Sequence, residues 1–328
     1  MGTHLLEVKN LKKTYPLRGT SNKLFAPKEH MIAVNDMSFY IEEGEIYGLV
    51  GESGCGKSTT GRAIVGLNKM DRGEILYNGK DLCKLSDREF RPLRKDLQMV
   101  FQDTLSALNP RGRIGDILEE TLIIHGMGDA AKRRETVLEI LQKVGLSEEH
   151  YFRYPHELSG GQVQRLGIAG ALIIQPKLIV CDEPVSALDV SIQAQIINLL
   201  LDLKEHQNLT YMFITHDLSV VKYISDRGGV MYLGNMVELA EADEIFHHPI
   251  HPYTEALLNA IPTTDTVGAK ELSILEGDIP SPVNPPKGCK FHTRCKYCTE
   301  ICTQVVPAWE EVRPNHFVAC HHKLEVKE

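Results

Sequence analysis

Residues that could bind phosphate lie together in the stretch GESGCGKSTT, residues 51–60. Its pattern Gly-x4-Gly-Lys-Ser is that of a P-loop, in which backbone N–H groups converge on an anion because no Cβ blocks its approach. We predict that Lys57 neutralises the β- and γ-phosphates of a nucleotide and that the Ser58 hydroxyl binds Mg²⁺. The predicted nucleotide-binding residues of this loop are Gly51, Ser53, Gly54, Cys55, Gly56, Lys57, Ser58 and Thr59.

Two adjacent carboxylates end the apolar stretch LIVCDE, residues 178–183. In a nucleotide site, Asp182 is placed to hold Mg²⁺ through water, as a Walker B acid does. Glu183 would then orient and polarise the attacking water as a general base. The alternative is an ordinary solvated strand end, but the P-loop in the same chain favours the nucleotide site.

The elements around these motifs predict an α/β fold. Residues 44–50 before the P-loop are apolar and predict a buried strand, and the residues after it have helical spacing. Residues 5–17 alternate like an edge strand, and residues 106–158 predict mostly helix. Strands followed by helices imply a largely parallel sheet, with ligand sites at the carboxyl ends of its strands.

Composition bounds the function classes. The chain has 328 residues, with 36 basic against 44 acidic side chains and a net charge of −8, which argues against a nucleic-acid partner. No apolar run has the length of a membrane span, and the first residues lack a signal-peptide pattern, so we expect a cytosolic chain.

A change of composition near Ile261 predicts the domain organisation. Residues 261–288 are rich in proline and glycine and read as a linker. We therefore predict a nucleotide-binding domain over 1–260 and a small cysteine-rich module over 289–328. The stretch between Arg18 and His30 is polar and irregular and predicts a loop.

Three further motifs follow in order along the first domain. The LSGGQ stretch contains Ser159, Gly160, Gly161 and Gln162 and predicts a second anion-binding turn at a helix start. The stretch SALD ends at Asp189, and FITHD supplies His216 at the end of a strand. Each motif is weak alone, but together and in this order they are specific.

With these motifs, residues 1 to about 260 resemble the ATP-binding subunits of ABC transporters. Tyr15 and Gln102 of VFQD also match that pattern. The resemblance implies a P-loop NTPase with a RecA-like core, an antiparallel β subdomain and a helical subdomain over about 104–160. It implies that Tyr15 stacks on adenine, that Gln102 senses Mg²⁺ and that His216 contacts the γ-phosphate.

The resemblance also implies a pair of subunits that share their ATP sites. The P-loop of one subunit and the turn at 159–162 of the other would sandwich one ATP, and Asp189 would link the two sites. Closure of the pair would exclude water from the reaction. Val163, Gly170 and Thr104 depart from the usual family pattern at positions that bear on contacts between subunits.

Two longer stretches resemble those of the oligopeptide/dipeptide (Opp/Dpp) importer branch, namely FQDTLSALNPR and HPIHPYTEALLNAIP. Within that branch, the insertion between Tyr15 and Val34 resembles that of the F-type subunit. That branch implies ATP hydrolysis coupled to uptake of di- or oligopeptides at the cytoplasmic face of the cell membrane. The implied partners are a D-type ATPase subunit, two transmembrane permease subunits and, indirectly, an extracytoplasmic solute-binding protein.

Other functions stay open at this point. The same ATPase role in a nickel, glutathione or other small-solute importer is one alternative, because the cargo is chosen by other subunits. A soluble ABC ATPase of DNA repair or translation is a different-class alternative, which the single nucleotide domain and acidic balance disfavour. A kinase or GTPase on the same P-loop would have no use for the LSGGQ stretch.

Five of the eight cysteines lie between Cys289 and Cys320, which suggests metal or redox chemistry in a cytosolic chain. The resemblance implies that Cys289, Cys295, Cys302 and Cys320 bind a [4Fe–4S] cluster, with Cys298 as a possible substitute ligand. Four thiolates would equally suit Zn²⁺, and a Cys₃His zinc site could use one of the nearby histidines. These are His292, His316, His321 and His322. Reduced, packed thiols are the remaining alternative.

Overall fold

The computed structural model describes residues 4–17, 30–261, 275 and 277–324. Most of the predicted loop at 18–30 and residues 262–274 and 276 of the predicted linker lie outside the described residues. The strands are β1 (Leu6–Pro16), β2 (His30–Ile41), β3 (Ile46–Val50), β4 (Arg72–Tyr77), β5 (Lys80–Asp81), β6 (Leu97–Val100), β7 (Leu178–Asp182), β8 (Thr210–Thr215), β9 (Arg227–Tyr232), β10 (Asn235–Glu241), β11 (Glu310–Arg313) and β12 (His316–Val318).

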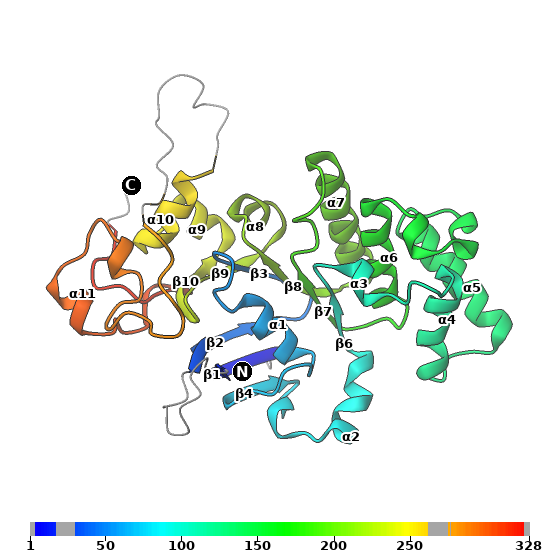
Figure 1. Cartoon of the computed structure of the whole chain (residues 1–328), viewed down its shortest axis with the longest axis horizontal. Coiled ribbons are helices and arrows are strands. Elements are labelled where there is room, and N and C mark those ends of the chain that lie inside the picture. The colour runs from blue at the N-terminus through cyan, green and yellow to red at the C-terminus, as the bar shows by residue number, and fades with distance from the viewer. Residues whose placement is uncertain (1–3, 18–29, 262–274, 276, 325–328) are drawn as a thin grey trace, which may run out of the picture.

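The α-helices are α1 (Lys57–Ile64), α2 (Asp87–Phe90), α3 (Thr104–Ala107), α4 (Ile114–Ile124), α5 (Ala130–Lys143), α6 (Gly160–Leu172), α7 (Val190–Gln207), α8 (Leu218–Ile224), α9 (Ala242–His247), α10 (Pro252–Asn259) and α11 (Glu300–Gln304). Helices α4 and α5 confirm the helical prediction for residues 106–158, and their apolar side chains pack against α6. Figure 1 shows this helical part on the side of the molecule opposite α11.

The main sheet has the strand order β11-β12-β10-β9-β3-β8-β7-β6 (Figure 1). The five strands from β9 to β6 are parallel, as predicted from the alternation of strands and helices. Strands β3, β7 and β8 are buried along their whole length, because helices cover one face of the sheet and α1 with the second sheet covers the other. The carboxyl ends of these three strands carry the P-loop, the two acids and His216.

The second sheet is antiparallel, with the order β2-β1-β4-β5. The prediction of an edge strand at residues 5–17 is wrong, because β1 lies between β2 and β4, with Leu6 opposite both Ile41 and Tyr77. Alternation of apolar and polar residues indicates only that one face of a strand is buried. Interior strands can show it as well as edge strands.

The cysteine-bearing tail joins the main sheet. Strand β12 pairs with β10, with Glu238 opposite Val318 and Leu239 opposite Phe317. Phe291 is buried and packs against Tyr253 in the same hydrophobic cluster. The sheet therefore continues from the residues of the nucleotide-binding part into the tail.

Buried Glu238 ties the turn before α10 to the tail. Its carboxylate accepts hydrogen bonds from the backbone N–H groups of Ile250 (2.7 Å) and His251 (3.0 Å). One of its oxygens lies 2.8 Å from Nε2 of His316 in β12. The HPIHPY stretch is therefore held by the same side chain that contacts strand β12.

Acid is expected to destabilise the fold through His251. Burial lowers the pKa of this imidazole to about 4 from 6.5, and its Nδ1 accepts the Tyr253 N–H. As the pH drops, the imidazole of the unfolded chain becomes protonated at a higher pH than that of the folded chain. The free energy of unfolding should therefore fall by on the order of 3 kcal/mol between about pH 6.5 and pH 4. Chemical denaturation across this pH range measures this loss. The free energy of unfolding should depend less steeply on pH in His251→Asn, whose side chain can still cap α10. Equal slopes for both proteins would contradict this assignment.

Candidate nucleotide-binding site

The P-loop connects the end of β3 to the start of α1, as predicted. Gly51, Gly54 and Gly56 all have positive φ, of 156°, 79° and 106°. A Cβ on Gly56 would lie 2.0 Å from the backbone oxygen of Ala33, and a Cβ on Gly51 would lie 2.1 Å from that of Met231. Both glycines are therefore required because other backbone segments pack closely against the loop.

Lys57 is folded back over the loop, and its side chain is buried. Its Nζ donates hydrogen bonds to the backbone oxygens of Gly51 (2.6 Å) and Glu52 (3.0 Å). The ammonium group is therefore held inside the curve of the loop, where it can meet the phosphates of a bound nucleotide.

Ser58 and Asp182 meet across 124 positions of sequence. The Ser58 hydroxyl donates a hydrogen bond of 2.7 Å to Oδ1 of Asp182, whose carboxylate is 1% exposed. Burial raises the pKa of Asp182, while the Ser58 hydrogen bond and the nearby Arg62 guanidinium oppose that shift. A hydroxyl and a buried carboxylate are oxygen ligands of the kind that Mg²⁺ prefers, so the pair fits the predicted magnesium site.

Removing the Ser58 hydroxyl should weaken use of Mg²⁺. In Ser58→Ala, a direct oxygen ligand is lost and Asp182 loses its hydrogen-bond donor, so the Mg²⁺ concentration for half-maximal ATP hydrolysis should rise about tenfold. Titration of Mg²⁺ at a fixed ATP concentration measures this shift. Ser58→Thr, which keeps a hydroxyl, should stay close to the parent protein, and a similar loss in both variants would count against the assignment.

Glu183 lies directly beside this pair, at the end of β7. Its Oε2 accepts a hydrogen bond of 2.9 Å from Nε2 of Gln102 and lies 3.5 Å from Nδ1 of His216. The structure thus brings together the three predicted catalytic side chains, which come from three separate strand ends. Glu183 has a φ of 48°, an uncommon backbone conformation for a side chain other than glycine that is found at functional sites.

A cavity of about 270 Å³ connects the P-loop with Gln102 and Glu183, whereas Asp182 and His216 do not line it. Its lining residues are Met31, Ile32, Ala33, Ser53, Gly54, Gly56, Lys57, Ser58, Thr59, Gln102, Glu183 and Pro282. Sequence reasoning missed the contributions of residues 31–33 and Pro282, which carry no polar side chain to signal them. The backbone of Pro282 reaches the site by accepting a hydrogen bond of 3.0 Å from the Ile32 N–H.

Tyr15 is not among the residues that line this cavity. It pairs with Met31 across β1 and β2, and its hydroxyl accepts a hydrogen bond of 3.3 Å from Asn68. Tyr15 is therefore beside a strand that lines the cavity, and its stacking on adenine stays a prediction.

The turn at residues 159–162 also lies outside that cavity. Ser159 is the N-cap residue of α6, and its N–H donates to Oε1 of Gln162 at 3.0 Å. Gly161 lies close to α7, because a Cβ there would be 2.7 Å from a methyl group of Ile192. Asp189 is exposed at the start of α7. The exposed residues here are Ser159, Gly160 and Asp189, and these are available to a second subunit.

Of the three family departures, Thr104 and Val163 are packed within the subunit, whereas Gly170 is not required by its surroundings. The Thr104 hydroxyl lies 3.0 Å from Oε1 of Gln164 in α6, and Val163 is buried. A Cβ on Gly170 would come no closer than 3.8 Å to Leu118, so this helical position has room for a side chain.

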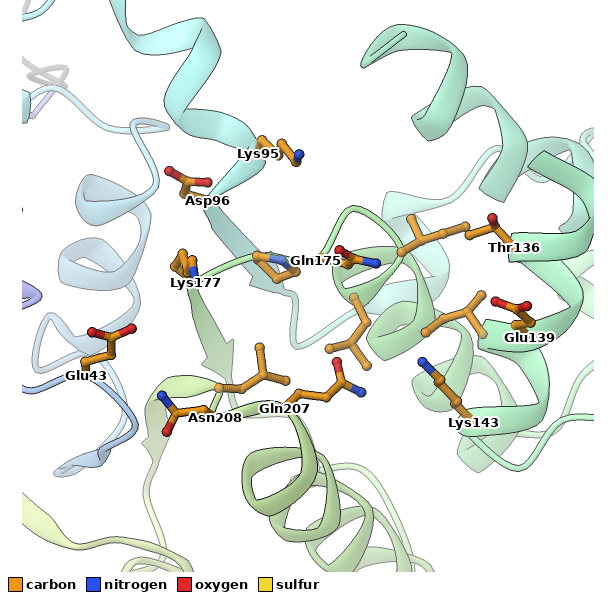
Figure 2. Close-up of a pocket in the computed structure, with 15 residues that line it drawn as sticks. Glu43, Lys95, Asp96, Thr136, Glu139, Lys143, Gln175, Lys177, Gln207 and Asn208 are labelled. Carbon is orange, nitrogen blue, oxygen red and sulfur yellow. The ribbon is translucent and has the colours of Figure 1, made fainter. Parts of the chain in front are cut away.

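A second cavity, of about 620 Å³, lies between α5 and the amino ends of β6, β7 and β8 (Figure 2). Its lining residues include Glu43, Lys95, Asp96, Glu139, Lys143, Lys177 and Asn208. The nucleotide-site residues follow the opposite ends of the parallel strands, so this cavity is separate from that site.

The five tail cysteines differ in exposure. Cys302 is buried, Cys289, Cys295 and Cys320 are half-buried, and Cys298 is exposed. Burial, with smaller contributions from the neighbouring thiols, raises the pKa of Cys320 to about 12 and that of Cys289 to about 11.

Within the residues described, no three Cys, His, Asp or Glu side chains form a group that could hold a metal ion. The arrangement therefore does not fit a formed metal site. Each nearby histidine makes a polar contact through one ring nitrogen: His292 Nδ1 lies 2.8 Å from the Cys289 oxygen, and His322 Nε2 lies 2.6 Å from the Thr299 hydroxyl. Nε2 of His316 contacts the Glu238 carboxylate, and Nε2 of His321 contacts the backbone oxygen of Val305.

Two family models match this chain. The one described as ABC transporter matches residues 34–186, which hold the P-loop and the two acids. The one described as Oligopeptide/dipeptide transporter, C-terminal region, matches residues 237–302, from β10 into the cysteine-bearing tail.

Full-length relatives and solved structures agree with these matches. The oligopeptide transport ATP-binding protein AppF of Bacillus subtilis is 51% identical, and the alignment covers 97% of each chain. OppF of Haemophilus influenzae is 51% identical over 96% of each chain. The dimeric structure of the ATP-binding cassette MJ0796 bound to ADP and Pi has a TM-score of 0.64 and 31% identity, covering 72% of this chain and 98% of that one.

Proposed function

Because this chain belongs to the ABC transporter ATP-binding proteins of the oligopeptide/dipeptide branch, we propose that it hydrolyses ATP to energise uptake of di- or oligopeptides across the cytoplasmic membrane. The observation that carries this proposal is the meeting of Lys57, Ser58 and Glu183 at one cavity. Peptide uptake by cells that lack the gene, complemented with the parent or with Glu183→Gln, tests it. Restored nickel or glutathione uptake without peptide uptake would favour another cargo.

In the proposed reaction, the P-loop N–H groups and Lys57 bind the β- and γ-phosphates. Ser58 would hold Mg²⁺ directly and Asp182 through water. Glu183 would accept a proton from the water that attacks the γ-phosphate. Gln102 would sense Mg²⁺ and His216 would contact the γ-phosphate, and both would also keep the Glu183 carboxylate oriented. The contacts of one Glu183 oxygen with both neighbours support this division of roles.

We also propose that two ATPase subunits complete each site. None of residues 159–162 lines the P-loop cavity of its own subunit, and Ser159 and Gly160 are exposed, so the turn can face the P-loop of a partner. The D-type subunit of the same branch is the partner proposed here, which makes the pair a heterodimer. Co-expression of tagged D-type and F-type chains, with sizing in ATP, distinguishes this from a homodimer.

The proposed location is the cytoplasmic face of the membrane, bound to two permease subunits that receive substrate from a solute-binding protein. No helix in the described part of the chain is long and apolar enough to cross a bilayer. Co-purification with the permease subunits from detergent-solubilised membranes tests this location. A tight ribosome or DNA complex would instead support a non-transport ABC ATPase.

A metal in the tail is a separate proposal, supported by the spacing of Cys289, Cys295, Cys302 and Cys320. The ligands proposed are these four thiolates, as in a [4Fe–4S] cluster, with zinc as the alternative metal. Iron, sulfide and zinc analysis of anaerobically purified protein decides between cluster, zinc and reduced thiols.

A further inference from the structure

Glu52, inside the P-loop, is held by residues from the C-terminal part of the chain. Its carboxylate accepts two parallel hydrogen bonds from the Arg294 guanidinium, of 2.7 Å and 3.0 Å. Its backbone N–H donates a hydrogen bond of 3.0 Å to the hydroxyl of Tyr253. Two partners that lie more than 200 positions away therefore hold one residue of the phosphate-binding loop.

Arg294 is itself firmly placed. Its side chain is 4% exposed, against 23% for that of Glu52, and its guanidinium carbon lies 6.0 Å from the ring centroid of Tyr232. It ends a short 3₁₀ turn that begins next to Phe291, which is buried against Tyr232 and Tyr253. This packing holds the Arg294 side chain in place beside the P-loop.

The ion pair also matters for charge. Glu52 lies in a loop that must receive a polyphosphate, and its backbone oxygen already accepts a hydrogen bond from Lys57 at 3.0 Å. A carboxylate without its partner would repel the phosphates, and water cannot screen a poorly exposed group well. Bidentate pairing with arginine neutralises that charge and fixes the geometry of the loop at the same time.

We propose that Arg294 is a positioning residue for ATP binding. It acts through Glu52, because it neutralises the Glu52 carboxylate and holds the P-loop in the conformation that receives the phosphates. The cysteine-bearing tail is thereby part of the nucleotide site, whatever its metal content. This inference rests on the proposed role of the P-loop in binding ATP.

The test is the dependence of ATP hydrolysis on ATP concentration in the assembled transporter. Arg294→Gln should raise KM for ATP about tenfold, with kcat changed less than about threefold, because binding and not chemistry is affected. Adding Glu52→Gln should bring KM back to within about threefold of the parent, since the unpaired charge is then gone. Arg313→Gln is the matched control, because it removes an exposed tail arginine that pairs with Glu244 instead.

An unchanged KM in Arg294→Gln, or a double variant no better than the single one, would overturn the inference. If Arg294→Gln does not assemble, Arg294→Lys serves instead: one ammonium cannot form the parallel pair, so KM should rise about threefold. An unchanged KM there would also overturn it. A Lys57→Ala variant with normal KM would show instead that the P-loop assignment itself is at fault.

Discussion

Glu183→Gln is expected to lower the rate of ATP hydrolysis at least about 100-fold while ATP still binds with nearly parental affinity. The amide keeps the size of the side chain but cannot accept the proton of the attacking water. It also removes the charge that faces His216 at 3.5 Å. Steady-state ATPase assays and equilibrium binding of ATP, both on the assembled transporter, measure the two quantities.

The matched control for this experiment is Glu241→Gln. Glu241 is an exposed carboxylate at the end of β10, in the same sheet, and it lies outside the cavity. Its replacement should leave hydrolysis unchanged. Parental hydrolysis in Glu183→Gln would move the role of general base to another group, with His216 the next to test.

Lys57→Ala should weaken ATP binding about 100-fold. The variant removes the only side-chain cation among the residues that line the described cavity, and it leaves the oxygens of Gly51 and Glu52 without its hydrogen bonds. Binding of a fluorescent ATP analogue, with thermal unfolding to confirm the fold, measures the effect.

Lys84→Ala is the control for this loss of a lysine. Lys84 is 72% exposed and pairs with Asp81 and Glu74 in the antiparallel sheet. It should bind ATP as the parent does. Equal binding in Lys57→Ala and Lys84→Ala would contradict the P-loop assignment.

Local sequence determined the parts of the site whose chemistry is carried by neighbouring residues. The P-loop could be predicted because its glycines, lysine and serine all lie within residues 51–58, between a strand and a helix. Asp182 and Glu183 could be predicted because an apolar run ending in acids signals a buried strand that opens into a polar site. The parallel sheet followed from the alternation of such strands with helices.

The edge position assigned to β1 was wrong because hydrophobic alternation reports burial of one face and says nothing about which strands lie on either side. Pairing is decided by contacts with β2, the next strand along the chain, and with β4, which follows the P-loop and α1. The same limit applies to the tail, where the cysteine spacing predicted a metal site but not the pairing of β12 with β10.

Which distant side chains meet is fixed by the packing of the folded chain. Gln102 and Glu183 are 81 positions apart, and Glu52 and Arg294 are 242 apart, yet both pairs lie within hydrogen-bonding distance. No local pattern encodes such contacts, because they depend on the order of the strands and on the packing of Phe291 and Tyr253 beside the loop. The sequence alone thus determined the phosphate-binding chemistry, whereas the folded chain decided that a C-terminal arginine supports it.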